Sequence, residues 1–294
     1  MSRLIAMFCE IDDFCKWFEP LYTHRLLQNG QRQRIRRTAL ALSEIMTIIV
    51  YCHNSRYRDC KHYYTEYVEG HLRPYFPALV SYSRFVELMP RVGVPLCGYL
   101  HTRQGRCTSI TFVDSTSLAV CHNRRISRHK VFDGYATRGK SSMGWYFGFK
   151  LHLMINDEGE LLAFRVTPGE VDDREPVWQM AEELWGHLYG DRGDISKALH
   201  DDLLAHGLRL ITLMRRTMKP RLMRLWDRLM LRKRFLIETV NDQLKNISQI
   251  EHSRHRSLTG CMVNLVGGLI AYTFQPKKPS LGLRCPVSGL PVAI

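Results

Sequence analysis

Hydrophobic residues recur every three or four positions in the first hundred residues, which predicts a mostly helical region at 1–104. Segments 43–53 and 83–92 show this spacing, and Ser43 is placed to cap the first of these helices. Short basic turns between the helices suit a helix-turn-helix-like module that binds DNA, and a plain helical bundle explains the same pattern equally well.

After Cys107 the chain becomes rich in β-branched residues and alternates apolar with polar positions, which is typical of strands. In the second strand, one face carries Phe147, Phe149, Leu151 and Leu153. The pattern predicts strands at 108–121, 146–157, 160–169, 187–193 and 208–214, and helices at 171–185 and 196–207. The order βββ-α-β-α-β, followed by more helix, predicts an α/β fold with a mixed sheet.

Two later segments have opposite characters. Residues 214–234 hold many Lys and Arg beside an apolar stripe of Leu222, Leu225, Leu229 and Met230, which predicts a basic amphipathic helix. Such a helix can contact phosphates or simply lie in solvent. Residues 261–274 are apolar but too short to span a membrane, so they predict a buried helix within a C-terminal part at 259–294, whose end is irregular.

The net charge of the chain limits the classes of partner that it is expected to bind. Of 294 residues, 42 are Lys or Arg and 28 are Asp or Glu, which gives a net charge of +14. This excess favours nucleic acid as partner and an anionic membrane surface second, while a basic surface without a partner remains open. Nine cysteines without a CxxC pair favour reduced thiols in the cytoplasm and argue against a disulfide-rich secreted protein or a common zinc site.

Three acidic residues occupy positions that suggest chemistry. Asp114 lies inside a β-branched run, where a charge is costly unless it is paired or binds a cation. Asp191 follows a strand between two glycines, and Glu238 shares a helical stripe with Arg234 and Lys245. Each has a simpler explanation: a strand-end acid, a turn residue and a surface ion pair, respectively.

Together the three acids suggest metal-dependent phosphoryl transfer. This chemistry needs carboxylates from separate elements to hold two Mg²⁺ ions, one at the attacking oxygen and one at the leaving oxygen. Arg234 and Lys245 would then contact the DNA backbone nearby. Asp242, four residues after Glu238, is a second candidate for the helical acid.

These residues carry a family resemblance that spans nearly the whole chain. The spacing R-x3-E-x6-K at Arg234, Glu238 and Lys245 resembles the signature of bacterial insertion-sequence DDE transposases. FVDST around Asp114 and GDRG around Asp191 resemble the first two acidic boxes. The blocks 62–92, 121–164 and 237–257 are most similar to the insertion-sequence 982 family.

The resemblance implies an RNase H-like catalytic domain at 105–258 with Asp114, Asp191 and Glu238 as catalytic and metal-binding triad. It implies Mg²⁺ or Mn²⁺, two ions, and the cutting and joining of DNA. The partners would be the terminal inverted repeats, bound by the N-terminal region, and target DNA. We expect a homodimer or larger assembly, no membrane association, and a cytoplasmic, nucleoid-associated protein. The other expected DNA contacts are Lys150, Arg192, Arg215 and Arg216.

Two residues depart from the pattern of that family. Leu231 stands where the wider signature has Tyr, and Asp194 stands where an aromatic residue is expected. Two alternatives therefore remain open: another RNase H-like metal-dependent nuclease, and a DNA-binding derivative with impaired catalysis.

Overall fold

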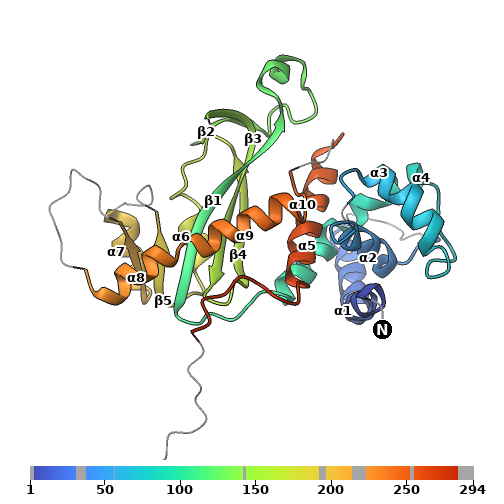
Figure 1. Ribbon diagram of the computed structural model, residues 1–294. Coiled ribbons are helices and arrows are strands. Elements are labelled where there is room, and N and C mark those ends of the chain that lie inside the picture. The colour runs from blue at the N-terminus through green and yellow to red at the C-terminus, as the bar shows by residue number, and fades with distance from the viewer. Residues whose placement is uncertain are drawn as a thin grey trace, which may run out of the picture.

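The computed structural model describes residues 3–30, 38–55, 57–141, 144–191, 197–213, 223–251 and 255–283. It combines a helical N-terminal region, a mixed β-sheet flanked by helices, and a long helix near the end (Figure 1). The α-helices are α1 (Arg3–Gln28), α2 (Leu42–Cys52), α3 (Cys60–His62), α4 (Tyr82–Leu88), α5 (Gly93–Thr102), α6 (Val177–Ala181), α7 (Lys197–Ala205), α8 (Leu225–Lys233), α9 (Phe235–Asn246) and α10 (Leu258–Thr273). A π-helix η1 (Tyr63–Leu72) and 3₁₀ helices η2 (Met89–Val92) and η3 (Asn123–Arg128) join them.

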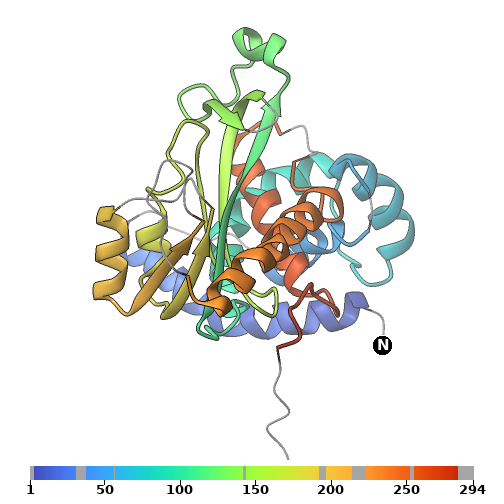
Figure 2. The same ribbon diagram turned by 60° about the vertical axis from the view of Figure 1, so that its left-hand side comes forward.

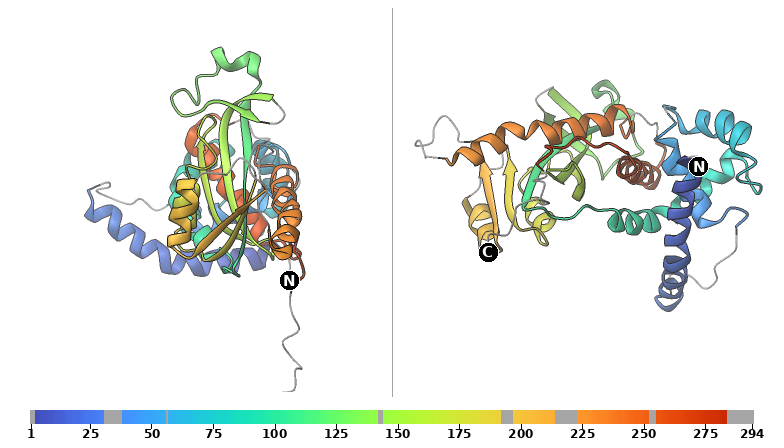
Figure 3. Two further views of the ribbon diagram at one scale, coloured as in Figure 1. Left: turned by 90° about the vertical axis from the view of Figure 1, so that its left-hand side faces the viewer. Right: turned by 60° about the horizontal axis from the view of Figure 1, so that its bottom comes forward.

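The predicted helical N-terminal region is confirmed, with one local correction. Helix α2 begins at Leu42, and Glu44 Oε2 accepts a hydrogen bond from Ala41 N at 2.7 Å, which satisfies one free amide of the first turn. Ser43 is therefore not the cap. It is buried, and its hydroxyl donates to Asp12 Oδ1 at 2.7 Å, tying α2 to α1. Figure 3 shows the C-terminal half of α1 extending beyond the rest of the chain.

The sheet has six strands in the order β2-β3-β1-β5-β6, and β4 also pairs with β3. Its strands are β1 (Ile110–Cys121), β2 (Thr137–Ser141), β3 (Gly144–Asn156), β4 (Leu161–Pro168), β5 (Gly186–Gly190) and β6 (Leu208–Thr212). Strand β3 runs antiparallel to β1, β2 and β4, whereas β5 is parallel to both β1 and β6. The predicted mixed sheet is confirmed, with β2 as an additional strand before the first crossover helix.

Helices cover both faces of the sheet (Figures 1 and 2). Helices α8 and α9 lie on one face, where Leu151 and Leu153 of β3 join the larger core with Val240 and Leu244 of α9. Helices α6 and α7 lie on the other face, around a smaller core that includes Met154. Alternating side chains of one strand therefore serve two cores, as expected for a sheet buried on both sides.

Two predicted helices differ from the structure. The helix expected at 171–185 is reduced to α6, because residues before Val177 form turns that end at Pro176. The basic helix expected at 214–234 is α8, and its residues 214–222 lie outside the described part. Its apolar stripe is also shifted: Met230 and Leu231 are buried, whereas Leu225 is 72% exposed.

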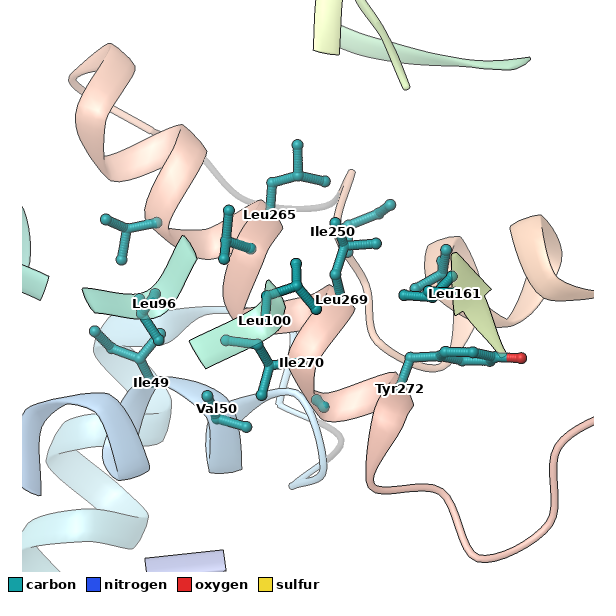
Figure 4. Packing of buried hydrophobic residues seen from close by; sticks show 14 of the residues in the cluster. Ile49, Val50, Leu96, Leu100, Leu161, Ile250, Leu265, Leu269, Ile270 and Tyr272 are labelled. Atoms are coloured by element: carbon teal, nitrogen blue, oxygen red, sulfur yellow. The ribbon is translucent and has the colours of Figure 1, made fainter. Parts of the chain in front are cut away.

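Helix α10 connects the C-terminal part to the N-terminal helices (Figure 4). Leu269 and Ile270 of α10 pack with Ile49 of α2 and Leu96 of α5 in one continuous core. The hydroxyl of Tyr272 also donates to Gly159 O at 2.7 Å, in the turn between β3 and β4. The segment predicted as a buried helix is therefore confirmed. Within the described ranges, none of the helices has the length and apolar character needed to cross a bilayer.

Gly148 provides a test of the packing between β1 and β3. A Cβ at this position would overlap the carbonyl oxygen of Leu118, whereas Gly70 in η1 has open space around it. We expect Gly148→Ala to lower the free energy of unfolding by about 2 kcal/mol or more, because backbone on two paired strands must separate. Gly70→Ala is the control and should change it by less than about 1 kcal/mol. Equal denaturant midpoints for Gly148→Ala and the unsubstituted protein would contradict the close approach.

Candidate active site

Asp114 lies on β1 at the point where α9 crosses the sheet. It is in register with Leu153 of β3 and shares the α9 side of the sheet with Phe112, two residues earlier. Its side chain is only 24% exposed. A carboxylate in this position needs compensating partners, and α9 supplies them.

Helix α9 presents an apolar side to the sheet and a polar stripe that runs beside Asp114 of β1. Leu236, Ile237, Val240 and Leu244 are buried, which fixes the rotation of the helix. Phe235 lies on the outer side and is 52% exposed. With this rotation, Arg234, which lies just before the helix, faces Asp114. Side chains spaced three and four residues apart along α9 lie on the same side.

Arg234 bridges the first and third predicted acids. Its Nη1 lies 3.3 Å from Asp114 Oδ1, and its Nη2 lies 2.6 Å from Glu238 Oε1. The Arg234 side chain is 18% exposed, whereas Glu238 is 54% exposed. A half-buried carboxylate, Asp114, and an exposed one, Glu238, thus lie on either side of a single cation.

Asn241 is a site residue that the sequence analysis did not identify. Its Nδ2 donates to Asp114 Oδ2 at 3.0 Å, and the residue is only 6% exposed. Its Oδ1 is buried and has no hydrogen-bond partner among the residues that the structure describes. The available signal was its spacing, because a residue three positions after Glu238 lies on the same stripe.

Burial raises the pKa of Asp114 to about 6, and the negative charge of Glu238 acts in the same direction. The Arg234 guanidinium and the Asn241 amide oppose the shift without cancelling it. Desolvation therefore outweighs these partners, and the ionised carboxylate has less stabilisation than it would have in water. Such a group is suited to receive a further cation.

Asp191 follows the end of β5, the neighbour of β1. Phe112 pairs with Tyr189 in the parallel register, and Asp114 and Asp191 each lie two residues beyond that pair. The second predicted acid is thus exposed at the end of the adjacent strand. However, across the described parts of the chain no three His, Cys, Asp or Glu side chains are grouped closely enough to hold a metal ion.

Asp242 has a different environment from Glu238. It is exposed and accepts a hydrogen bond from Asn246 Nδ2 at 2.6 Å within α9. Glu238, not Asp242, is bonded to the arginine that also contacts Asp114. These contacts favour Glu238 as the acid contributed by the helix.

The predicted DNA contacts differ in their surroundings. Lys245 Nζ lies 3.2 Å from Glu251 Oε2, and Glu251 Oε1 accepts from Ala119 N at the bulge in β1. Lys150 Nζ lies 3.0 Å from Asp173 Oδ1 and also donates to Val171 O. Both lysines thus have internal partners, and their contacts with DNA stay predictions. Arg192, Arg215 and Arg216 lie outside the described residues, as does Asp194.

The donors at this site fit a hard divalent cation. Carboxylate and amide oxygens are the ligands that Mg²⁺ and Mn²⁺ prefer, and Asp114, Glu238 and the unpartnered Asn241 Oδ1 are of this kind. The cation that Asp114 and Glu238 share in the structure is the Arg234 guanidinium. A metal ion that bound these oxygens would compete with Arg234.

Comparison with known proteins adds one finding to this geometry. Residues 104–258, more than half of the chain, match a family model described as a transposase DDE domain. This range contains Asp114, Asp191 and Glu238, together with Arg234 and Asn241. A comparison of the chain with curated proteins finds no match.

Proposed function

Because the chain belongs to the transposase DDE domain family, we propose that it binds the ends of a bacterial insertion sequence and cuts and joins DNA. In this proposal the sheet and its helices form an RNase H-like core, and Asp114, Asp191 and Glu238 are the DDE triad. We further propose that the chain belongs to the insertion-sequence 982 family, which its sequence blocks resemble. The helical N-terminal region would bind the terminal inverted repeats.

One observation supports this assignment most directly. Arg234 joins Asp114 on β1 to Glu238 on α9, across 124 residues of sequence, while Asp191 follows β5, the strand that pairs with β1. We infer from these contacts that three elements of the matched region contribute the proposed triad. Two-metal phosphoryl transfer requires carboxylates that come from separate elements of the fold.

Each residue of the site would have a separate role in the proposed reaction. Asp114, Glu238 and Asp191 would hold divalent ions, Mg²⁺ or Mn²⁺, which stabilise charge on the attacking and leaving oxygens when bound. Asn241 would hold the Asp114 carboxylate in place through its amide. Arg234 and Lys245 would bind backbone phosphates beside the site, with Lys150, Arg192, Arg215 and Arg216 as further contacts.

Two phosphoryl transfers would complete the reaction. In cleavage, a water oxygen bonds to phosphorus and the 3′ oxygen leaves as a hydroxyl. In joining, that 3′-hydroxyl bonds to a target phosphorus and a target P–O bond breaks, so no external energy source is needed. Since both ends must be held together, we propose a homodimer or larger assembly on DNA, located in the cytoplasm with the nucleoid.

A strand-transfer assay tests this proposal. The protein is incubated with Mg²⁺, a labelled duplex that carries the ends of its own element, and unlabelled plasmid. We expect label to become covalently joined to the plasmid, and an Asp114→Ala variant should bind the duplex but join nothing. Nicking without joining would instead indicate another RNase H-like nuclease. DNA binding without either reaction would indicate a derivative that has lost catalysis.

A further inference from the structure

The Arg234 guanidinium occupies the position between two carboxylates that a divalent cation would also occupy. It contacts Asp114 Oδ1 at 3.3 Å and Glu238 Oε1 at 2.6 Å. With 18% of its side chain exposed, Arg234 is held inward, against the sheet. As long as it stays there, the two acids are neutralised by the protein itself, and a metal ion must compete with a bound cation.

The same guanidinium has a second class of partner. Arginine binds phosphate through two parallel hydrogen bonds, and phosphates of a DNA backbone would approach the exposed side of the site, where Glu238 is 54% exposed. The guanidinium has five N–H donors but only one positive charge, which the two carboxylates already share, so a phosphate would compete with them for that charge. Binding of DNA would therefore withdraw Arg234 from Asp114 and Glu238.

Asn241 explains why the site could remain in order after Arg234 leaves. Its amide group holds Asp114 Oδ2 independently of Arg234, at 3.0 Å. Its buried Oδ1 is without a partner in the described structure, so it supplies an oxygen on the same side of the sheet. Loss of the guanidinium would thus leave an ordered group of oxygens lacking a cation.

From these contacts we propose that Arg234 couples DNA binding to metal binding. Without DNA, Arg234 acts as an internal counter-cation and weakens the affinity of the site for divalent ions. With DNA, Arg234 moves to a phosphate and the carboxylates become available. This rests on the proposed function, and it adds that the metal site is completed only on DNA. Because linkage is reciprocal, metal must tighten DNA binding by the same factor.

Binding measurements on the full chain test the coupling without any catalytic readout. Free Mn²⁺ is measured by electron paramagnetic resonance at fixed ionic strength, with and without a short mixed-sequence DNA duplex, and Mn²⁺ bound by DNA alone is subtracted. We expect the duplex to raise the Mn²⁺ affinity of the unsubstituted protein by about 5- to 150-fold, the usual range of such couplings. Fluorescence anisotropy of labelled duplex should show the same factor when Mn²⁺ is added.

Two variants separate Arg234 from the general effect of charge. Arg234→Gln should bind Mn²⁺ more tightly than the unsubstituted protein when DNA is absent, and DNA should then add little. Arg232→Gln removes the same charge from an exposed position two residues away and should retain the full coupling. Circular dichroism confirms that each variant is folded.

The outcomes are distinct. Equal Mn²⁺ affinity of the unsubstituted protein with and without DNA would overturn the coupling, and this measurement needs no variant. Weaker Mn²⁺ binding by Arg234→Gln would also overturn it, since Arg234 would then assemble the site. If Mn²⁺ binding is absent in every state, including on DNA, the proposed metal-dependent function itself fails.

Discussion

Replacing Glu238 by Gln is expected to reduce DNA strand cleavage by more than about 100-fold, because loss of a metal ligand should exceed the cost of losing an outer-shell partner. Asp242→Asn removes an acid of equal charge four residues further along α9 and should leave cleavage within about twofold. Glu238 is bonded to Arg234 beside Asp114, whereas Asp242 is bonded to Asn246. Cleavage of a labelled duplex that carries the element ends, in Mg²⁺, measures both effects.

The comparison also needs a measure of DNA binding. Without divalent metal, both variants should bind the duplex with similar affinity at equal salt, since neither acid is expected to contact phosphate. A large loss of cleavage in Asp242→Asn, with Glu238→Gln remaining active, would show that Asp242, and not Glu238, is the metal ligand on α9. Loss of binding in Glu238→Gln would instead show that its effect is not confined to catalysis.

Replacing Asp114 by Asn is expected to stabilise the fold at pH 7 while abolishing cleavage. The pKa of Asp114 is raised from 3.8 to about 6, so the folded state binds its proton more tightly than the unfolded state. Stability contributed by this group is therefore present at low pH and is lost as the pH rises from about 4 to about 6. A shift of about two pKa units corresponds to roughly 3 kcal/mol of lost stability above that range.

Asparagine resembles the protonated, neutral form, so the variant avoids this loss. The free energy of unfolding of Asp114→Asn should exceed that of the unsubstituted protein by about 2–3 kcal/mol at pH 7. The difference should fall toward zero only well below pH 3.8, where Asp114 is neutral in both the folded and the unfolded state. Guanidinium-chloride unfolding at several pH values measures it. A variant that is less stable at pH 7 would mean that the Arg234 ion pair outweighs the cost of burial.

The two results expected for Asp114→Asn would mean that the ionised Asp114 lowers the stability of the fold and is needed for the proposed cleavage. Asp114 is kept ionised in a place where ionisation is unfavourable, and its neutral substitute is expected to fold better and to cut no DNA. Sites of this kind are common in enzymes, because groups that must bind a ligand cannot be fully satisfied without it.

The strands could be predicted because their sequences carry their own signal. In the segment 146–157 every second residue from Phe147 to Leu153 is apolar, and each face of β3 packs against one core. Strand β2 carries no such signal, since its sequence TRGKS is polar and it forms by pairing with the first residues of β3. Its existence depends on a partner strand, which local patterning does not report.

The residues of the candidate site also differ in how well the sequence predicts them. Asp114, Glu238 and Arg234 were identified because a charge in a strand and a spaced motif are unusual, and because the chain resembles a known family. Asn241 is harder to predict, because its position on the Glu238 stripe is a weak signal for an uncharged amide. Its role depends on contact with a residue 127 positions earlier. The pairing of Lys245 with Glu251 was likewise hidden, because it requires the chain to turn after α9.

The packing of α10 against α2 and α5 has a consequence for how the protein is made. Residues of α2 and α5 leave the ribosome long before α10, yet Ile49 and Leu96 share one core with Leu269 and Ile270. During synthesis, the apolar sides of the early helices therefore lack their partner until nearly the whole chain has emerged. A nascent chain should thus complete the packing of its N-terminal helices only after residues 104–258, the region that matches the DDE domain, have been translated.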